Sequence, residues 1–118
     1  SFGRLDMNGS EAERFAEQFL LQRHLVLLQR NYRCRFGEID LIMRNGETLV
    51  FVEVRLRSSS VFGGAAASVT SFKQTKLLRT ARHYLASLKT TPSCRFDVVL
   101  LSGCNGEEIE WIKDAFGE

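Results

Sequence analysis

The sequence predicts a mixed α/β domain in which one helix, three strands, a second helix and two strands follow one another. The first observation behind this prediction is the pair Asn45-Gly46, which separates two runs of alternating apolar residues and is typical of a β-hairpin. The second is a pair of helical apolar patterns, one before the hairpin and one after it. The second helix is long enough for a right-handed crossover to a parallel strand, so we expect a mixed sheet with helices packed on it.

The composition is that of a single globular domain. The chain has 118 residues, of which 44% are hydrophobic and 25% are charged, and this suffices for one core but not for two. We expect one domain over residues 1–118, with residues 1–8 as a disordered start or an addition to the natural chain. No apolar run has the length of a membrane span or of a secretory leader, so we expect a cytoplasmic protein without a membrane partner.

The cysteines give no sign of a disulfide framework or of a zinc site. Cys34, Cys94 and Cys104 are odd in number and show no CxxC spacing. Three reduced thiols are what we expect of a protein in the cytosol.

The first predicted helix covers residues 11–23. Ser10 can cap it, with Glu13 at the spacing of a capping box. The apolar residues that recur at the spacing of one helical face are Ala12, Phe15, Ala16, Phe19 and Leu20. A strand is expected over residues 26–33, where a short apolar run continues into alternating polar residues.

The predicted hairpin joins strands over residues 38–43 and 48–57. A type I′ turn needs positive φ at both central positions, which Asn45-Gly46 can provide. This loop would place Asp40 opposite Phe51. The residues that would then share one face of the sheet are Glu38, Asp40, Phe51, Glu53 and Arg55. A three-residue loop would instead turn one of the two strands over.

The hairpin carries the first indication of a functional site. With the symmetric loop, Asp40 and Glu53 are diagonal neighbours, about 7–8 Å apart at the backbone and closer at their side-chain ends. Two or three carboxylates at such distances repel one another, and a divalent cation between them removes the repulsion. The pattern therefore indicates a metal site.

The second half of the chain begins with a loop of small residues over residues 58–67, expected to pack at one end and to move at the other. A helix is expected over residues 71–88. Its predicted buried stripe consists of Phe72, Leu78, Ala81, Leu85 and Leu88, helped by Leu77 and Tyr84. Pro92 follows it, then a buried strand over residues 95–102 and a short one over residues 109–112.

Charge is unevenly distributed along the chain. The formal net charge is +2, yet residues 54–96 carry eight basic and no acidic side chains. The remaining residues have eight basic and 14 acidic side chains. Such asymmetry favours a polyanionic partner, and the structural alternative is a solvated basic helix face.

Several stretches together resemble a known family. These stretches include both strands of the predicted hairpin, and they are Gly37-Glu38-Ile39-Asp40-Leu41-Ile42, Val50-Phe51-Val52-Glu53-Val54-Arg55-Leu56-Arg57, Phe62-Gly63-Gly64, Lys73-Gln74-Thr75-Lys76-Leu77, Arg95-Phe96-Asp97 and Trp111-Ile112-Lys113-Asp114. By these stretches the chain resembles the bacterial YraN family of uncharacterised proteins. That family belongs to the PD-(D/E)XK superfamily, which has the restriction-endonuclease-like fold and is similar in fold to archaeal Holliday-junction resolvases.

The resemblance implies a metal-dependent nuclease that hydrolyses DNA phosphodiester bonds, with branched or damaged DNA among its substrates. Carried over to this sequence, the metal ligands are Glu13, Asp40, Glu53 and the backbone carbonyl of Val54, and the ion is Mg²⁺ or Mn²⁺. The superfamily's usual lysine is Arg55 here.

Arg55 sets limits on the implied chemistry. An arginine keeps its proton, so Arg55 can stabilise charge on the phosphate but cannot act as a base. Glu38 or solvent would then accept the proton of the attacking water. The residues expected to hold the nucleic-acid backbone are Arg57, Lys73, Gln74 and Lys76.

Each assignment also has a structural alternative. Glu13 can simply cap its helix, and Asp40 can be an ion-pair partner of Arg55. Three functions therefore stay open: a DNA nuclease, a nucleic-acid-binding module with a degenerate nuclease site, and an interaction domain for an acidic protein. A homodimer is expected only if the substrate is a four-way junction, because cutting it needs two symmetric sites.

Overall fold

The computed structural model describes residues 8–57, 69–102 and 108–117. Its elements are α1 (Gly9–Leu21), β1 (Val26–Cys34), β2 (Gly37–Asn45), β3 (Thr48–Arg57), α2 (Ser71–Leu85), β4 (Cys94–Ser102) and β5 (Glu108–Phe116). The predicted order of one helix, three strands, one helix and two strands is confirmed. The predicted loop over residues 58–67, Cys104 and the side chain of Arg57 lie outside the description.

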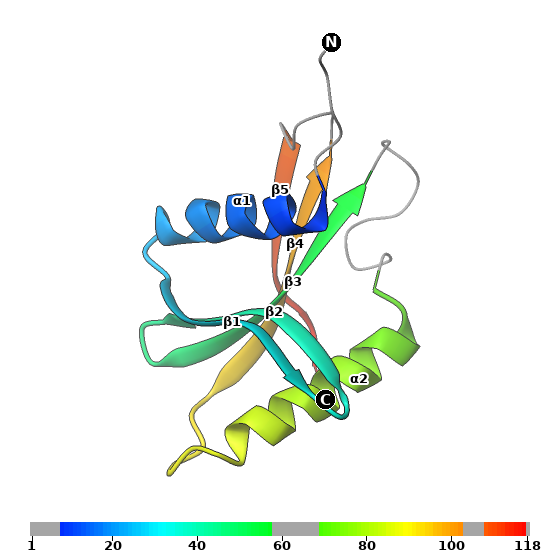
Figure 1. Ribbon diagram of the computed structural model, residues 1–118. Helices are drawn as coiled ribbons and strands as arrows, with labels where there is room; N and C mark the ends of the chain where they lie inside the picture. The colour runs from blue at the N-terminus through cyan, green and yellow to red at the C-terminus, as the bar shows by residue number, and fades with distance from the viewer. Residues whose placement is uncertain (1–7, 58–68, 103–107, 118) are drawn as a thin grey trace.

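The strands form one sheet in the order β1-β2-β3-β4-β5 (Figure 1). Neighbouring strands are antiparallel except β3 and β4, which are parallel and are connected through α2. The mixed sheet and its parallel crossover are thus confirmed, and β1 and β5 are the edges. Neither described helix is long and apolar enough to cross a membrane.

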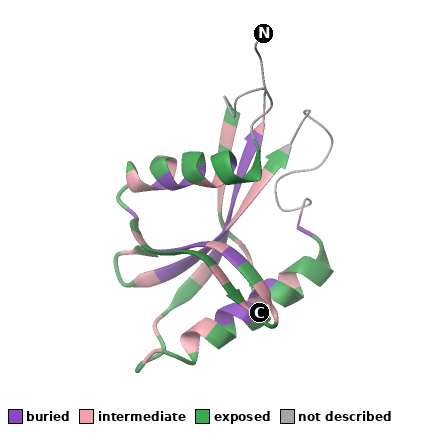
Figure 2. Cartoon of the chain, in the orientation of Figure 1, coloured by how far each residue is buried: buried purple, intermediate pink, exposed green. Residues whose placement is uncertain are grey.

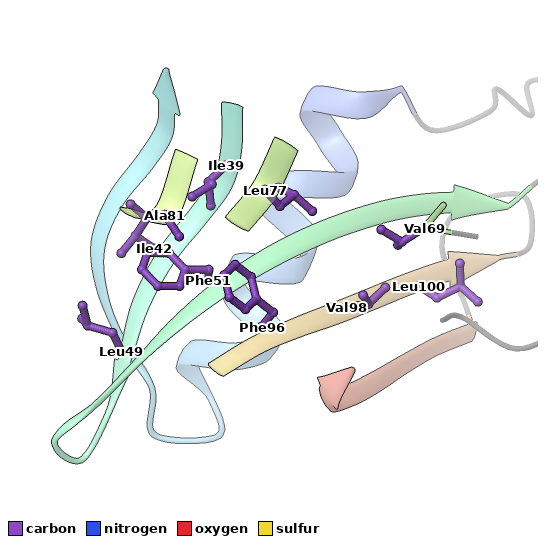
Figure 3. Packing of buried hydrophobic residues seen from close by; sticks show 10 residues of the cluster. All are labelled: Ile39, Ile42, Leu49, Phe51, Val69, Leu77, Ala81, Phe96, Val98 and Leu100. Atoms are coloured by element: carbon purple, nitrogen blue, oxygen red, sulfur yellow. The ribbon is translucent and has the colours of Figure 1, made fainter. Parts of the chain in front are cut away.

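The two helices cover opposite faces of the sheet, because side chains alternate between the two faces along each strand. On one face Leu77 and Ala81 of α2 pack against a cluster that includes Ile42, Phe51 and Phe96 (Figure 3). On the other face, Ala16 and Leu20 of α1 pack in a second cluster, whose other buried members are Leu25, Leu41, Met43, Val50, Val52, Val99 and Leu101. Both clusters meet at the central strands, which are the most deeply buried part of the chain (Figure 2).

The start of α1 differs from the prediction. Asn8, not Ser10, is the N-cap, and its Oδ1 accepts the Glu11 backbone N–H at 2.8 Å. The Glu11 carboxylate accepts the backbone N–H of Asn8 in return at 2.9 Å, which completes the capping box. Asparagine caps a helix as well as serine does, so the box forms two residues earlier. Glu13 is therefore not required for capping.

The hairpin register also differs from the prediction. Asn45 pairs with Thr48, so the two loop residues are Gly46 and Glu47. Only Gly46 of the turn has a positive φ, of 64°, as a type II′ turn requires with glycine at its first central position. Leu41 pairs with Val52. If the same register is extended by one residue, Asp40 lies opposite Glu53, whereas the prediction placed it opposite Phe51. The partner of Asp40 thus changes by two residues, an even number, and Asp40 and Glu53 stay together on one face as predicted.

Helix α2 ends at Leu85, three residues before the predicted end, and its buried residues are Leu77, Thr80 and Ala81. The prediction that Phe72 belongs to the buried stripe is wrong, because Phe72 is 72% exposed. Successive residues of an α-helix are rotated by about 100°, so Phe72 lies about 140° around the helix from Leu77. It therefore points away from the sheet.

Strand β5 is longer than predicted and reaches Phe116, which stacks on Phe96 with ring centroids 5.0 Å apart. Asp97, fully buried in β4, holds this extension in place. Its carboxylate accepts hydrogen bonds from Trp111 Nε1 at 2.8 Å and from the Asp114 backbone N–H at 2.9 Å. Arg95 Nε donates to the same group at 3.0 Å and supplies the opposite charge.

Gly37 allows the β1–β2 turn to pack directly on α2. Its φ is +152°, and a Cβ placed there would lie 3.0 Å from Thr80 Oγ1. We expect Gly37→Ala to lower the free energy of unfolding by about 1–3 kcal/mol, through backbone strain and this close approach. Thermal or urea unfolding measures the loss.

The matched control is Gly9→Ala in the first turn of α1, where an added Cβ meets no atom within 4 Å. Alanine is the better helix former, so this variant should be as stable as the parent protein or more stable. Equal stabilities of the two variants would contradict the packing described here.

Candidate metal and nucleic-acid site

A pocket of about 230 Å³ lies where β2 and β3 meet the first turns of α2. The residues that line it are Glu38, Asp40, Glu53, Lys73, Lys76 and Leu77. Acidic side chains come from the strands and basic ones from the helix. The pocket thus unites acids of the hairpin with lysines that lie 20 or more residues later in the sequence.

Asp40 is half-buried in this pocket, and its Oδ2 accepts the Val54 backbone N–H at 2.8 Å. Burial and the nearby charge of Glu53 raise the pKa of Asp40 to about 8. The charges of Glu13 and Glu38 raise this pKa further, while the hydrogen bond from Val54 lowers it. Without a cation, Asp40 therefore carries a proton at neutral pH.

The carboxyl group of Glu53 lies beside that of Asp40, and its side chain is only 14% exposed. Burial raises the pKa of Glu53, and the positive charges of Arg55 and Lys73 partly oppose this effect. Arg55 Nη1 lies 3.4 Å from Glu53 Oε2. Arg55 therefore forms an ion pair with Glu53. The described ion pairs do not include the alternative one between Arg55 and Asp40.

Glu13 of α1 is connected to the site through Asn31 of β1. Its Oε1 accepts a hydrogen bond from Asn31 Nδ2 at 2.8 Å, and the same nitrogen lies 3.3 Å from Glu38 Oε2. Glu38 also pairs with Arg33 at 3.3 Å. Glu13 itself lines a neighbouring pocket of about 260 Å³, so it influences the charge of Asp40 without sharing its pocket.

Asn31 is a site residue that the sequence analysis missed. Its φ is +50°, a left-handed conformation that asparagine tolerates better than most residues, in the middle of edge strand β1. The regular pairing of β1 with β2 skips Asn31, and its amide bridges Glu13 and Glu38 instead. An asparagine in an alternating strand pattern is the only sequence signal for this irregularity.

The acids offer an incomplete set of metal ligands. Within the described ranges, no group of three or more His, Cys, Asp or Glu side chains is arranged to hold a metal ion. Mg²⁺, however, is commonly bound by one or two carboxylates, with water and phosphate oxygens completing its octahedron. Asp40 and Glu53 fit that smaller requirement, since they are adjacent, partly buried and mutually repulsive.

The residues predicted to contact nucleic acid do not all lie at the acidic pocket. Lys73 and Lys76 are exposed and line the acidic pocket. Gln74 does not line it, and its Nε2 donates to the Val69 carbonyl at 3.0 Å, which ties the start of α2 to the preceding residues. The structure therefore brings the two lysines to the acids and gives Gln74 a structural contact.

The fold and this pocket define a mixed α/β protein in which half-buried carboxylates of two strands face lysines of a helix. The uncharacterised protein family UPF0102 matches residues 12–101. The chain belongs to this family, and the resemblance to YraN proteins is confirmed.

Relatives match nearly the whole chain. The UPF0102 protein of Nitrosospira multiformis is 65% identical over 112 residues, covering 95% of this chain and 94% of that protein. A UPF0102 protein of Nitrosomonas europaea is 64% identical over 93% of both chains. That of Methylobacillus flagellatus is 56% identical over 92% of this chain and 95% of its own length. None of these descriptions names an activity.

The raised pKa of Asp40 has a measurable consequence for stability in the absence of metal. Between the ordinary value of 3.8 and about 8, the folded protein retains a proton that the unfolded chain has released. The Asp40 contribution to the free energy of unfolding therefore falls as pH rises through this interval. Asp40→Asn removes this pH-dependent contribution, because an asparagine side chain does not ionise. Its amide oxygen can still accept the Val54 N–H.

We expect Asp40→Asn to melt at least about 4 °C above the parent protein at pH 8 and close to it at pH 4. Thermal unfolding with EDTA between pH 4 and pH 9 measures the difference. Glu47→Gln, a change of the same kind in the exposed hairpin turn, is the control and should melt close to the parent protein at pH 8. A difference between Asp40→Asn and the parent protein that stays constant with pH would contradict the raised pKa.

Proposed function

We propose that this UPF0102 protein is a metal-dependent nuclease that hydrolyses DNA phosphodiester bonds. The observation that carries the proposal is the shared pocket, in which Asp40 and Glu53 lie opposite Lys73 and Lys76. Paired carboxylates attract a divalent cation, and ammonium groups nearby attract the phosphate that such a cation activates. The resemblance to PD-(D/E)XK nucleases, which present acids in the same chain order, supports the same reading.

Asp40 and Glu53 would hold Mg²⁺ or Mn²⁺, with the Val54 carbonyl as a further oxygen ligand. The bound ion supplies a Lewis acid and lowers the pKa of a water molecule. Lys73 and Lys76 hold the phosphate by charge alone, which positions a backbone without reading its sequence.

Arg55 and the outer acids have supporting roles. Arg55 pairs with Glu53 and can turn its remaining N–H groups to the charge that develops on the phosphate. It keeps its own proton, so Glu38, which lines the pocket, is the acceptor that the site provides for a proton of the attacking water. Glu13 adds negative charge through the Asn31 bridge and strengthens the attraction for a cation.

Arg55 also favours a second candidate function. Where the superfamily's lysine would stand, an arginine keeps charge but cannot give up a proton, which suits binding better than hydrolysis. A nucleic-acid-binding module with a degenerate site is therefore the alternative. An acidic protein partner is the third possibility, and it would leave the affinity for DNA negligible at every salt concentration.

We expect the purified protein to cut labelled DNA in Mg²⁺ or Mn²⁺. The substrates to compare are single strands, duplexes, flaps and four-way junctions. Asp40→Asn and Glu53→Gln should each lower the rate at least about 100-fold, because each replaces a charged carboxylate ligand of the activating ion with a neutral amide. The control is Glu110→Gln on edge strand β5, whose exposed side chain lies outside the pocket lining, and it should cut at the parent rate.

Salt-dependent binding without cutting in either metal would support the binding module and reject the nuclease. Cutting that survives both acid variants would show that the activity comes from another site or from a contaminant. Cutting of four-way junctions alone would further require a homodimer, which sedimentation of the protein–DNA complex detects.

A further inference from the structure

Phe72 stands out among the apolar residues on the surface. It is 72% exposed, whereas the other exposed large apolar residues of the described chain, Phe15, Val26, Leu28 and Leu56, are 40–43% exposed. Its ring belongs to neither hydrophobic cluster of the sheet. An aromatic ring held in water to this extent contributes little to folding, so another role is worth examining.

The ring lies next to a lysine that lines the acidic pocket. Phe72 and Lys76 are four residues apart on α2, and Lys76 Nζ is 5.5 Å from the centre of the Phe72 ring. Lys76 also lines the pocket with Asp40 and Glu53. One lysine therefore joins the exposed ring to the candidate metal site.

This arrangement places an apolar planar surface beside Lys76, which lines the pocket together with Lys73. Proteins that bind single-stranded nucleic acids combine these elements: cations follow the phosphates, and aromatic rings stack on the bases. Bases within a duplex already stack on both neighbours and offer no free face. A ring beside the phosphate-binding lysines thus favours a strand whose bases are unpaired at that point.

We propose that Phe72 is a stacking platform for an unpaired base next to the phosphate held by Lys73 and Lys76. The substrate class is DNA with single-stranded nucleotides beside the scissile bond, such as a flap, an overhang or a single strand. This inference rests on the proposed nuclease or binding function and adds the specificity that the acids alone do not supply.

Fluorescence anisotropy with labelled DNA, in EDTA so that binding is read apart from cutting, tests the inference. Phe72→Ala should bind a single strand and a flap at least about 5-fold more weakly, and a blunt duplex within twofold of the parent protein. Phe72→Trp should keep the affinity for the single strand. Lys73→Ala should weaken binding to all three, because the phosphate contact is common to them.

Phe15→Ala is the matched control, since Phe15 is an exposed phenylalanine on α1, across the sheet from α2. It should leave every affinity unchanged. Melting temperatures of the two Phe72 variants should match the parent protein, because the Phe72 ring packs in neither hydrophobic cluster.

Two results would overturn the stacking role alone. One is equal binding of Phe72→Ala and the parent protein to every DNA, and the other is an equal loss for single strand and duplex. A changed elution volume of Phe72→Ala with unchanged affinities would assign the ring to self-association instead. A parent protein that binds no DNA at low salt would remove the proposed function as well, so the two failures are distinguishable.

Discussion

The proximity of Asp40 and Glu53 is the constraint on which the site depends. Two carboxyl groups on neighbouring strands lie in one partly buried pocket, and burial and repulsion raise the pKa of Asp40 to about 8. Such an arrangement is unfavourable for the metal-free fold. Two contacts reduce this energetic cost: the Val54 N–H donates a hydrogen bond to Asp40, and Arg55 forms an ion pair with Glu53. A divalent cation would turn the same repulsion into affinity.

The fold and the central pair of acids could be predicted from the sequence because both follow from periodicity. Side chains alternate along a strand, so Asp40 and Glu53 stay on one face for any hairpin register that differs by an even number of residues. The turn proved to be Gly46-Glu47, one residue later than predicted, which changes the cross-strand partner of Asp40 by two residues and keeps both acids on one face. An odd shift would have separated the acids.

The surroundings of the acids could not be predicted, because they depend on interactions between distant segments. Because Asn8 and Glu11 form the capping box, Glu13 is free to accept a hydrogen bond from Asn31. The left-handed conformation of Asn31 follows from no repeating pattern in the sequence. Hydrophobicity alone predicts that Phe72 lies in the core, but its position on α2 directs the ring away from the sheet. Nothing in the sequence distinguishes Asp97 from the other acids, because two of its hydrogen-bond donors, Trp111 and the Asp114 N–H, lie on a separate strand, β5.

The most direct measurement of the central claim is the anomalous X-ray signal of Mn²⁺ in crystals grown above pH 8, where Asp40 is ionised. The account predicts one strong peak about 2 Å from carboxylate oxygens of both Asp40 and Glu53, and its loss in Glu53→Gln crystals. Full occupancy by Mn²⁺ elsewhere on the chain, with none between these two side chains, would contradict it.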